Sequence, residues 1–366
     1  MPNFAPTEEQ EEIRNLARSV AIDHLRPHGR SAEKRGEISL ELMHTLMQTG
    51  LTTPFPESLG GSGPIEAIPY SLIAEELGFG DGALAMNILG SLMGPVAVLL
   101  AGDETQQGHF ITPFCDEREG YMRFGSFAFA ERTGGYSLAD ISATARLDGE
   151  NYIVNGTKRD VIHGGHSRPR VVLLRLEGTT GMDGLCLFTI PPMQPTGMHI
   201  RSDLQKLGLI AATSVSLTFD NVTIPPVDML GKPRDSGVIR AATLYSILRG
   251  AVACGMARAA LEYARDYARE RIAFGRPIAS YQGIAFMVAE MAMKLDAARL
   301  LVWRAAASWD RGPANEMLVN EAEAAQRQAI QIAKSATTDA VQILGGAGFI
   351  QDHPVEMWMR NAAAME

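Results

Sequence analysis

The chain has 366 residues, of which 46% are hydrophobic and 20% charged, and its formal net charge is -9. This length predicts two or three domains with a sizeable core, and the composition excludes intrinsic disorder. A negative chain has no overall attraction to nucleic acid or to an anionic membrane surface, so we expect no nucleic-acid partner.

The three cysteines, Cys115, Cys186 and Cys254, are far apart and lack the spacing of a metal site or a redox pair. We therefore expect unpaired thiols and no metal site. The N-terminal segment becomes acidic and helical at once, without the basic and apolar regions of a targeting signal. We also expect no uncharged apolar run of about 18 residues, the length of a membrane span. Together these features predict a cytoplasmic protein without a membrane span.

The first third of the chain has the period of helices. Residues 7–25 suit an amphipathic helix that opens on a capping box of Thr7 and Gln10, and we expect Pro27 to end it. A second helix over 40–49 ends at Gly50 and leads into a loop rich in glycine and proline. Further helices are predicted over 66–79, 82–101 and 103–114.

The middle of the chain has a different texture. From about Phe124, short apolar or alternating runs such as "RVVLLRLE" and "SVSLTFDNVTIP" are separated by Gly, Asn, Asp and Pro. This pattern is typical of strands and turns. After Gly231 the helical period returns in long segments, as in a four-helix bundle.

The order helices, strands, longer helices predicts an α+β protein and disfavours a Rossmann fold. We expect an N-terminal all-α domain at 1–123, an antiparallel β domain at 124–232 and a C-terminal four-helix-bundle domain at 233–366.

Five separated strings resemble the acyl-CoA dehydrogenase family of flavoproteins, in the same order and at similar spacing over almost the whole chain. They are "FPESLGGSG" (55–63), "YIVNGTK" (152–158), "KLGLIAATSVSLTFDNVTIP" (206–225), "ARERIAFGRPIASYQGIAFMVAEMAMKLDAAR" (268–299) and "DAVQILGGAGFIQDHPVEMWMR" (339–360). The resemblance implies the α, β, α fold of that family, an acyl-CoA substrate and an FAD cofactor at a subunit interface.

The resemblance also implies cofactor-binding residues. Arg271 and Phe274 resemble the pair that reaches the ADP half of an FAD bound mainly by the neighbouring subunit. Gln282 and Gln342 resemble two glutamine contacts, and Gly345 and Gly346 resemble backbone that approaches the cofactor. A guanidinium can chelate a pyrophosphate, and glycine lets a cofactor come close. Read without the resemblance, Arg271 suits a solvated helix face and the glycines suit a helix C-cap.

The segments that resemble the flavin-facing part of the family are altered. In "AERTGGYS" (130–137), Ala130 stands in place of a threonine and Tyr136 in place of a serine. In "DVIHG" (160–164), Asp160 replaces an aromatic residue and Ile162 replaces a hydroxyl that would contact the flavin. The resemblance assigns Ala130 and Ile162 to the cofactor, and Tyr136 and Arg249 to the substrate pocket. His163 and His166 are candidate substitute donors.

No catalytic base can be assigned from the sequence. The family uses a glutamate to remove the α-proton of the thioester. Leu248 occupies the position used by one branch, and the position used by the commoner branch lies three residues beyond Glu366. We interpret Glu366 as non-catalytic.

Three functional hypotheses remain open. The first is FAD-dependent α,β-dehydrogenation of an acyl-CoA, with electrons passing to an electron-transfer flavoprotein. The second is a non-catalytic or half-site subunit of a mixed oligomer, because the contacts offered to a neighbour are retained while the flavin face is changed. The third is a flavoenzyme of the same fold that acts on another substrate, with Tyr136 and Asp160 setting specificity. A homo-oligomer or a hetero-oligomer with a related subunit is expected in each case.

Overall fold

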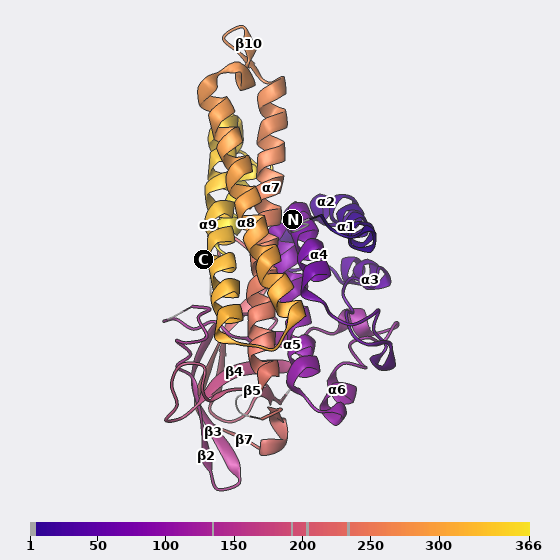
Figure 1. Cartoon of the computed structure of the whole chain (residues 1–366), viewed down its shortest axis with the longest axis vertical. Coiled ribbons are helices and arrows are strands. Elements are labelled where there is room, and N and C mark those ends of the chain that lie inside the picture. The colour runs from indigo at the N-terminus through magenta and orange to yellow at the C-terminus, as the bar shows by residue number, and fades with distance from the viewer. Residues whose placement is uncertain (1–4, 134, 192, 203–204, 233–234) are drawn as a thin grey trace.

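The computed structural model describes residues 5–133, 135–191, 193–202, 205–232 and 235–366 (Figure 1). A group of short helices, a β-sheet and a bundle of long helices follow one another along the chain, which confirms the predicted α, β, α order. The predicted domain limits fall in the connections before the first long strands and before the bundle. As limits of independent units they remain predictions.

The N-terminal helix begins as predicted but does not end at Pro27. Helix α1 (Glu8–Val20) opens on the capping box, in which the Thr7 and Gln10 side chains bond each other's backbone N–H. It continues through a π-helical segment, Ala21–Leu25, into α2 (Arg26–Arg35). Pro27 lies in the first turn of α2, where a backbone N–H is not needed, so the expectation that it stops the helix is wrong.

The remaining N-terminal helices are α3 (Leu40–Gln48), α4 (Ala67–Gly80), α5 (Gly82–Ala101) and α6 (Glu104–Phe110). Helix α4 packs between α1 and the bundle, α5 packs on α7 (Ser236–Glu270), α6 packs on α5, and α3 lies beside the turn Gly120–Met122. Helix α5 contains no charged residue over its 20 positions, so the expectation that the chain lacks an uncharged run of membrane-span length is wrong. In length and apolar composition α5 and α7 could each cross a membrane, but the apolar windows of both are 89% buried within the protein. Their apolar surface therefore serves the core.

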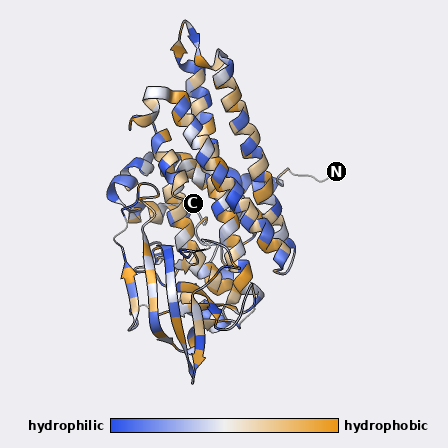
Figure 2. Cartoon of the chain, turned by 90° about the vertical axis from the view of Figure 1, so that its left-hand side faces the viewer, coloured by the Kyte–Doolittle hydropathy of each residue, from blue (hydrophilic) through white to orange (hydrophobic). Residues whose placement is uncertain are grey.

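The sheet has eight strands in the order β6-β7-β3-β2-β4-β5-β8, with β1 beside β4. Most pairings are antiparallel, as predicted, but β1 and β2 each run parallel to β4. Figure 2 shows hydrophilic and hydrophobic residues interleaved along these strands. The strands are β1 (Ser126–Ala128), β2 (Thr144–Asp148), β3 (Asn151–Ile162), β4 (Arg170–Leu176), β5 (Leu185–Ile190), β6 (Met198–Arg201), β7 (Ser214–Ile224) and β8 (Met229–Leu230).

Three long helices and a short one make up the C-terminal bundle. They are α7, α8 (Gln282–Arg311), α9 (Glu316–Leu344) and α10 (Val355–Ala363). A small hairpin of β9 (Ile272–Ala273) and β10 (Arg276–Pro277) caps the end of the bundle that lies farthest from the sheet (Figure 1). Short 3-10 turns occur at Glu57–Leu59, Gly120–Met122, Pro226–Asp228, Ile278–Ser280 and Gly345–Phe349.

One hydrophobic core joins the N-terminal helices, the bundle and one face of the sheet, while a second core lies within the sheet itself. Glycines allow α4 and α7 to pack closely. A Cβ on Gly78 of α4 would lie 2.4 Å from the carbonyl oxygen of Val252 on α7. The N-terminal helices are therefore part of the same packed interior as the bundle.

Candidate functional site

A large cavity lies where the sheet, α5 and the bundle meet, and we call it the inner cavity. Its volume is about 600 Å³. Its wall is formed by the end of β3 and the start of β7, by the segment that joins β6 to β7, and by the loop that carries Tyr136 between β1 and β2. Helices α5, α7, α9 and α10 complete it. The lining residues are Met86, Tyr136, Arg159, Asp160, Ile162, Lys206, Leu207, Gly208, Leu209, Ala212, Ser214, Arg249, Lys334, Thr338, Met359, Arg360, Ala363, Ala364, Met365 and Glu366.

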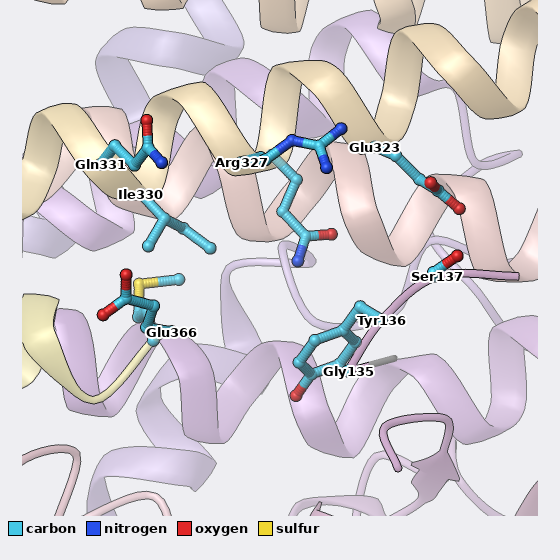
Figure 3. Close-up of a pocket in the computed structure, with 10 residues that line it drawn as sticks. Gly135, Tyr136, Ser137, Glu323, Arg327, Ile330, Gln331 and Glu366 are labelled. Carbon is cyan, nitrogen blue, oxygen red and sulfur yellow. The ribbon is translucent and has the colours of Figure 1, made fainter. Parts of the chain in front are cut away.

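A second cavity of about 240 Å³, the outer cavity, lies between α9 and the loop that carries Tyr136 (Figure 3). Its lining residues are Gly135, Tyr136, Ser137, Glu323, Gln326, Arg327, Ile330, Gln331, Met365 and Glu366. Tyr136, Met365 and Glu366 line both cavities. The two cavities are therefore neighbours that share one wall.

Arg249 lines the inner cavity and contacts two residues of that wall. The Arg249 guanidinium lies 3.6 Å from the centroid of the Tyr136 ring, and its Nη2 donates a hydrogen bond of 2.6 Å to the carbonyl oxygen of Met365. Arg249 is only 4% exposed, and its Nε has no hydrogen-bond partner among the described residues. An unpartnered buried donor is costly unless a ligand satisfies it. The inner cavity thus carries a cationic group suited to a polar or anionic ligand.

The outer cavity also holds a polar atom without a partner. Gln326 on α9 is 7% exposed, and its Oε1 has no hydrogen-bond partner among the described residues. Glu323, one turn earlier, accepts a hydrogen bond of 3.0 Å from the backbone N–H of Leu138, and burial raises the pKa of its carboxyl group. The outer cavity can therefore accept hydrogen bonds from a ligand that carries N–H groups.

Lys206 adds a second cation to the inner cavity. Its Nζ donates to the carbonyl oxygens of Leu209 at 2.8 Å and Ala212 at 2.5 Å, and burial lowers its pKa to about 8 although Asp160 opposes the shift. No carboxylate among the described residues makes a salt bridge with Lys206 or Arg249. Positive charge in a partly dry cavity favours negative charge on a ligand.

The two side-chain carboxylates that line the inner cavity are each paired with a cation. Asp160 accepts from Arg159 Nε at 2.6 Å, and Glu366 accepts from Lys334 Nζ at 2.6 Å. Leu248, the sequence position of one possible base, is fully buried in α7 and does not line the cavity. Asp160 and Glu366 are thus the carboxylates that the described lining offers for proton transfer.

A buried ion pair fixes the loop that carries Tyr136. Lys158 on β3 is 0% exposed and donates to Glu131 at 2.6 Å, and Glu131 also accepts from the backbone N–H groups of Ser142 and Ala143. These partners hold the pKa of Glu131 below its usual value despite burial. The loop therefore starts from a rigid anchor against β3.

The end of β3 is anchored to α5. Asp160 and His163 have positive φ angles of 53° and 58°, which let the strand bulge before Val161 and place Ile162 against Gly90. His163 is 4% exposed, lies 3.1 Å from Asn87 Oδ1 and stacks on Phe124. It does not line either cavity, so the candidate role of His163 as a substitute donor inside the site is wrong, and His166 is likewise absent from the lining.

The structure divides the predicted site residues into two groups. Tyr136, Ile162 and Arg249 line the inner cavity, and Ala130 is buried just behind it at the start of the anchored loop. The other six lie at the hairpin end of the bundle and are exposed: Arg271, Phe274, Gln282, Gln342, Gly345 and Gly346. Arg249 and Arg271 are 22 positions apart along α7, which corresponds to roughly 33 Å. One chain therefore does not bring the two groups to a common cavity.

The exposed group has unusual backbone geometry. Phe274 and Gly275 form the two-residue turn of the hairpin with φ angles of 51° and 84°, and the Phe274 side chain is 96% exposed. Gly345 has φ 58° and ψ -129°, a conformation open to glycine, and a Cβ there would meet nothing within 4 Å. An exposed aromatic ring beside bare backbone is suited to contact with another molecule.

Lys206, Lys334 and Gln326 were not predicted as site residues. Lys206 is the first residue of the segment 206–225 that resembles the family, but nothing in the sequence around this single lysine predicts that its side chain is buried. Gln326 and Lys334 lie in a helix whose sequence shows only amphipathic period, and the orphaned Oε1 of Gln326 becomes visible only once α9 is packed.

Comparison with known proteins covers the whole chain. Residues 7–118 match the family profile described as acyl-CoA dehydrogenase, N-terminal domain, residues 126–222 match the middle domain, and residues 237–366 match the C-terminal domain.

Relatives and solved structures match over nearly the same length. An acyl-CoA dehydrogenase of Bacillus subtilis is 33% identical over 360 residues, covering 97% of this chain and 93% of that protein. The mitochondrial short-chain specific acyl-CoA dehydrogenase of Rattus norvegicus is 31% identical over 362 residues, covering 98% and 82%. The structure of butyryl-CoA dehydrogenase from Megasphaera elsdenii superposes with a TM-score of 0.85 at 28% identity, covering 100% of this chain and 95% of that one.

Proposed function

The chain belongs to the acyl-CoA dehydrogenase family, and from this membership we propose that its two cavities bind an acyl-CoA thioester for FAD-dependent α,β-dehydrogenation. One observation supports this assignment of the site. Tyr136, Met365 and Glu366 line both cavities, so the outer cavity with its polar residues adjoins the larger, mainly apolar inner cavity.

The outer cavity suits the amide-bearing arm of coenzyme A. Gln326 offers an unpartnered acceptor to an amide N–H, and Arg327 and Gln331 on the same face of α9 offer donors to amide carbonyls. The inner cavity then receives the acyl group, with Met86, Leu209 and Met359 among its apolar lining residues. The thioester carbonyl lies at the shared wall in this arrangement.

Lys206 and Arg249 favour the reaction electrostatically. Removal of the α-proton places negative charge on the thioester oxygen, and preorganised positive charge in a site closed to water stabilises it. Asp160 and Glu366 each lie beside a cation at the cavity, and a carboxylate in this position is a candidate proton acceptor. We propose that proton transfer uses one of these two groups.

The residues present fit FAD. The unpartnered Nε of Arg249 and the apolar side chain of Ile162 suit a flavin ring, and Arg271 with the bare backbone of Gly345 suits a pyrophosphate. When bound, FAD supplies the acceptor for the hydride that leaves the β-carbon. Because Arg271 follows the end of α7 and Arg249 lies 22 positions earlier in that helix, we propose that each FAD is held by the inner cavity of one subunit and the hairpin end of another.

A second copy of the chain is the partner that the bundle surface fits. Exposed apolar residues recur on α8 at a spacing of seven, Phe286, Met293 and Leu300, so they share one face of the helix. Ile272, Phe274, Phe349 and Ile350 continue the exposed apolar surface at the hairpin end. Contiguous exposed apolar surface marks an interaction site, and a helix face of this spacing packs well against a partner helix.

An electron-transfer flavoprotein as electron acceptor and a role in lipid metabolism follow from the sequence resemblance. A cytoplasmic location follows from the cysteines and the N-terminal segment. All three remain predictions. The chain's own substrate within the acyl-CoA class is also open to experiment.

The half-site hypothesis stays as the second candidate because of one observation. Ala130 and Ile162 carry no hydroxyl group, so the cavity end of the chain gives a flavin fewer hydrogen bonds than the family usually offers. In that case this chain completes the FAD site of a related subunit through its hairpin end.

The visible absorption of the purified protein tests these candidates. We expect the unmodified protein to bind one FAD per subunit and its flavin absorption to bleach on addition of a CoA thioester. Phe286→Glu disrupts the apolar face of α8, so we expect that variant to lose both FAD binding and bleaching. Leu147→Glu on β2, an apolar residue of similar exposure away from the bundle, is the matched control and keeps both. A protein that takes up no FAD alone but does so with a related subunit supports the half-site candidate, and one that binds neither FAD nor thioester overturns the proposal.

A further inference from the structure

Among the aromatic side chains that the structure describes, Tyr136 alone lines both cavities. We propose that Tyr136 is a specificity-determining residue that narrows the passage between the outer and inner cavities and excludes thioesters branched beside the carbonyl. This inference rests on the proposed function, in which the thioester lies at the wall that the two cavities share.

The Tyr136 ring is held by its neighbours on several sides. The Arg249 guanidinium covers one face at 3.6 Å, while Phe129 at 5.4 Å and Tyr245 at 6.0 Å contact the ring edge to face. Cation–π and aromatic contacts of this kind each stabilise one ring position by a few tenths to about 2 kcal/mol. Figure 3 shows the ring beneath α9, facing the outer cavity. The ring therefore has a preferred position in the passage.

The backbone that carries the ring is fixed on both sides. Before it, the N–H of Glu131 donates to the carbonyl oxygen of Gly135 at 3.0 Å, and Glu131 is locked to Lys158. After it, the Leu138 N–H donates to Glu323 on α9. A segment anchored to both β3 and α9 cannot move far to admit a wider substrate. Tyr136 thus acts as a fixed constriction.

The carbon next to the thioester carbonyl is the part of the substrate that meets this constriction. A straight acyl chain presents a CH₂ group there, whereas a 2-methyl chain presents one more methyl group. Buried steric differences of one methyl or methylene group change the specificity constant by roughly 10- to 200-fold. We therefore expect the protein to prefer straight chains over 2-methyl chains by a factor in that range.

The test compares n-butyryl-CoA with isobutyryl-CoA on the FAD-loaded protein, by kcat/KM and by calorimetric Kd. In the unmodified protein the straight thioester is preferred by at least about tenfold, and in Tyr136→Ala the ratio falls to within about threefold. Tyr136→Phe keeps the ring and keeps the preference. Tyr136→Leu keeps more of the packing beside Arg249 than Tyr136→Ala does. We expect it to lower the preference for n-butyryl-CoA while circular dichroism shows that the fold is kept.

The outcomes separate the two proposals. A Tyr136→Ala protein that still prefers n-butyryl-CoA by the unmodified factor, while binding both thioesters, overturns the role of Tyr136 and leaves the dehydrogenase function intact. An unmodified protein with no preference also overturns it. If neither the unmodified protein nor any Tyr136 variant binds a CoA thioester in calorimetry, the proposed function is overturned, and the role of Tyr136 with it.

Discussion

The guanidinium of Arg249 stacks 3.6 Å above the ring of Tyr136 while one of its nitrogens bonds the backbone of Met365, so a single side chain braces both parts of the wall between the cavities. The same geometry occurs once more on α7, outside the site. Arg240 lies 3.6 Å over the Trp309 ring and donates to two backbone carbonyls at the far end of α8.

This pair of arginines gives a matched test. Arg249→Lys keeps the charge but loses the planar group, so we expect the free energy of unfolding to fall by about 1–2 kcal/mol and thioester affinity to fall by about tenfold. Arg240→Lys lowers stability similarly and leaves affinity unchanged. Urea unfolding and calorimetry measure the two quantities. Equal affinity in both variants would contradict the placement of Arg249 in the site.

The buried pair of Lys158 and Glu131 supports the loop that carries Tyr136. Lys158→Met leaves Glu131 charged and without its cation, and we expect the free energy of unfolding to fall by about 3–5 kcal/mol. The double variant Lys158→Met with Glu131→Gln removes both charges and recovers most of that loss. Urea unfolding of the three proteins checks the prediction, and a single variant as stable as the parent would refute it.

Acid should destabilise the protein through His163. Burial is the main cause that lowers the pKa of His163 from 6.5 to about 3, and the nearby His166 adds to the shift. Below pH 6.5 His163 binds a proton in the unfolded chain but not in the folded chain. The contribution of His163 to the free energy of unfolding is therefore fully present above pH 6.5 and is lost as the pH falls toward 3. The expected loss from this group at pH 5 is about 2 kcal/mol.

Unfolding in urea at pH 7 and pH 5 measures that loss. His163→Asn tolerates the positive φ at this position and does not titrate, so its stability should change less between the two pH values. His166→Asn is the control for the partly exposed neighbour. The assignment fails if the pH dependence of His163→Asn equals that of the unmodified protein.

Arg271 should contribute to FAD affinity and little to stability, because it is exposed at the hairpin end of α7. Arg271→Ala removes a charge-assisted hydrogen bond to the pyrophosphate, so we expect FAD to bind roughly 10- to 100-fold more weakly. Arg269→Ala, two residues earlier and equally exposed, is the control and should bind FAD normally. Fluorescence titration of the flavin-free protein compares them.

Local sequence signals predicted elements well where the signal was complete. The helix over 82–101 coincides with α5, because Asp81 caps it and an unbroken apolar run follows. The end expected at Pro27 was wrong, because the π-helical segment Ala21–Leu25 brings the proline into a first helical turn. A single sequence does not show such a change of helical period.

The site was predictable only in part. Resemblance pointed to Tyr136, Ile162 and Arg249, which the fold brings to one cavity from three distant segments. Lys206 and Gln326 were not predicted as site residues. The role of Lys206 depends on its burial, and that of Gln326 depends on an amide oxygen without a hydrogen-bond partner. Both properties arise from tertiary packing, which the sequence does not show. The resemblance already implied that Arg271 serves an FAD bound mainly by a neighbouring subunit, and its distance from Arg249 along α7 agrees with that expectation.

The close contact of Gly78 with Val252 has a consequence for synthesis of the chain. Helices α4 and α5 leave the ribosome before the whole sheet-forming segment, yet the helix that covers them, α7, is made after it. During that interval the nascent chain exposes a 20-residue helix with no charged side chain. We expect a fragment ending at residue 123 to be retained by chaperones or to aggregate, and to become soluble when the bundle segment is supplied in trans.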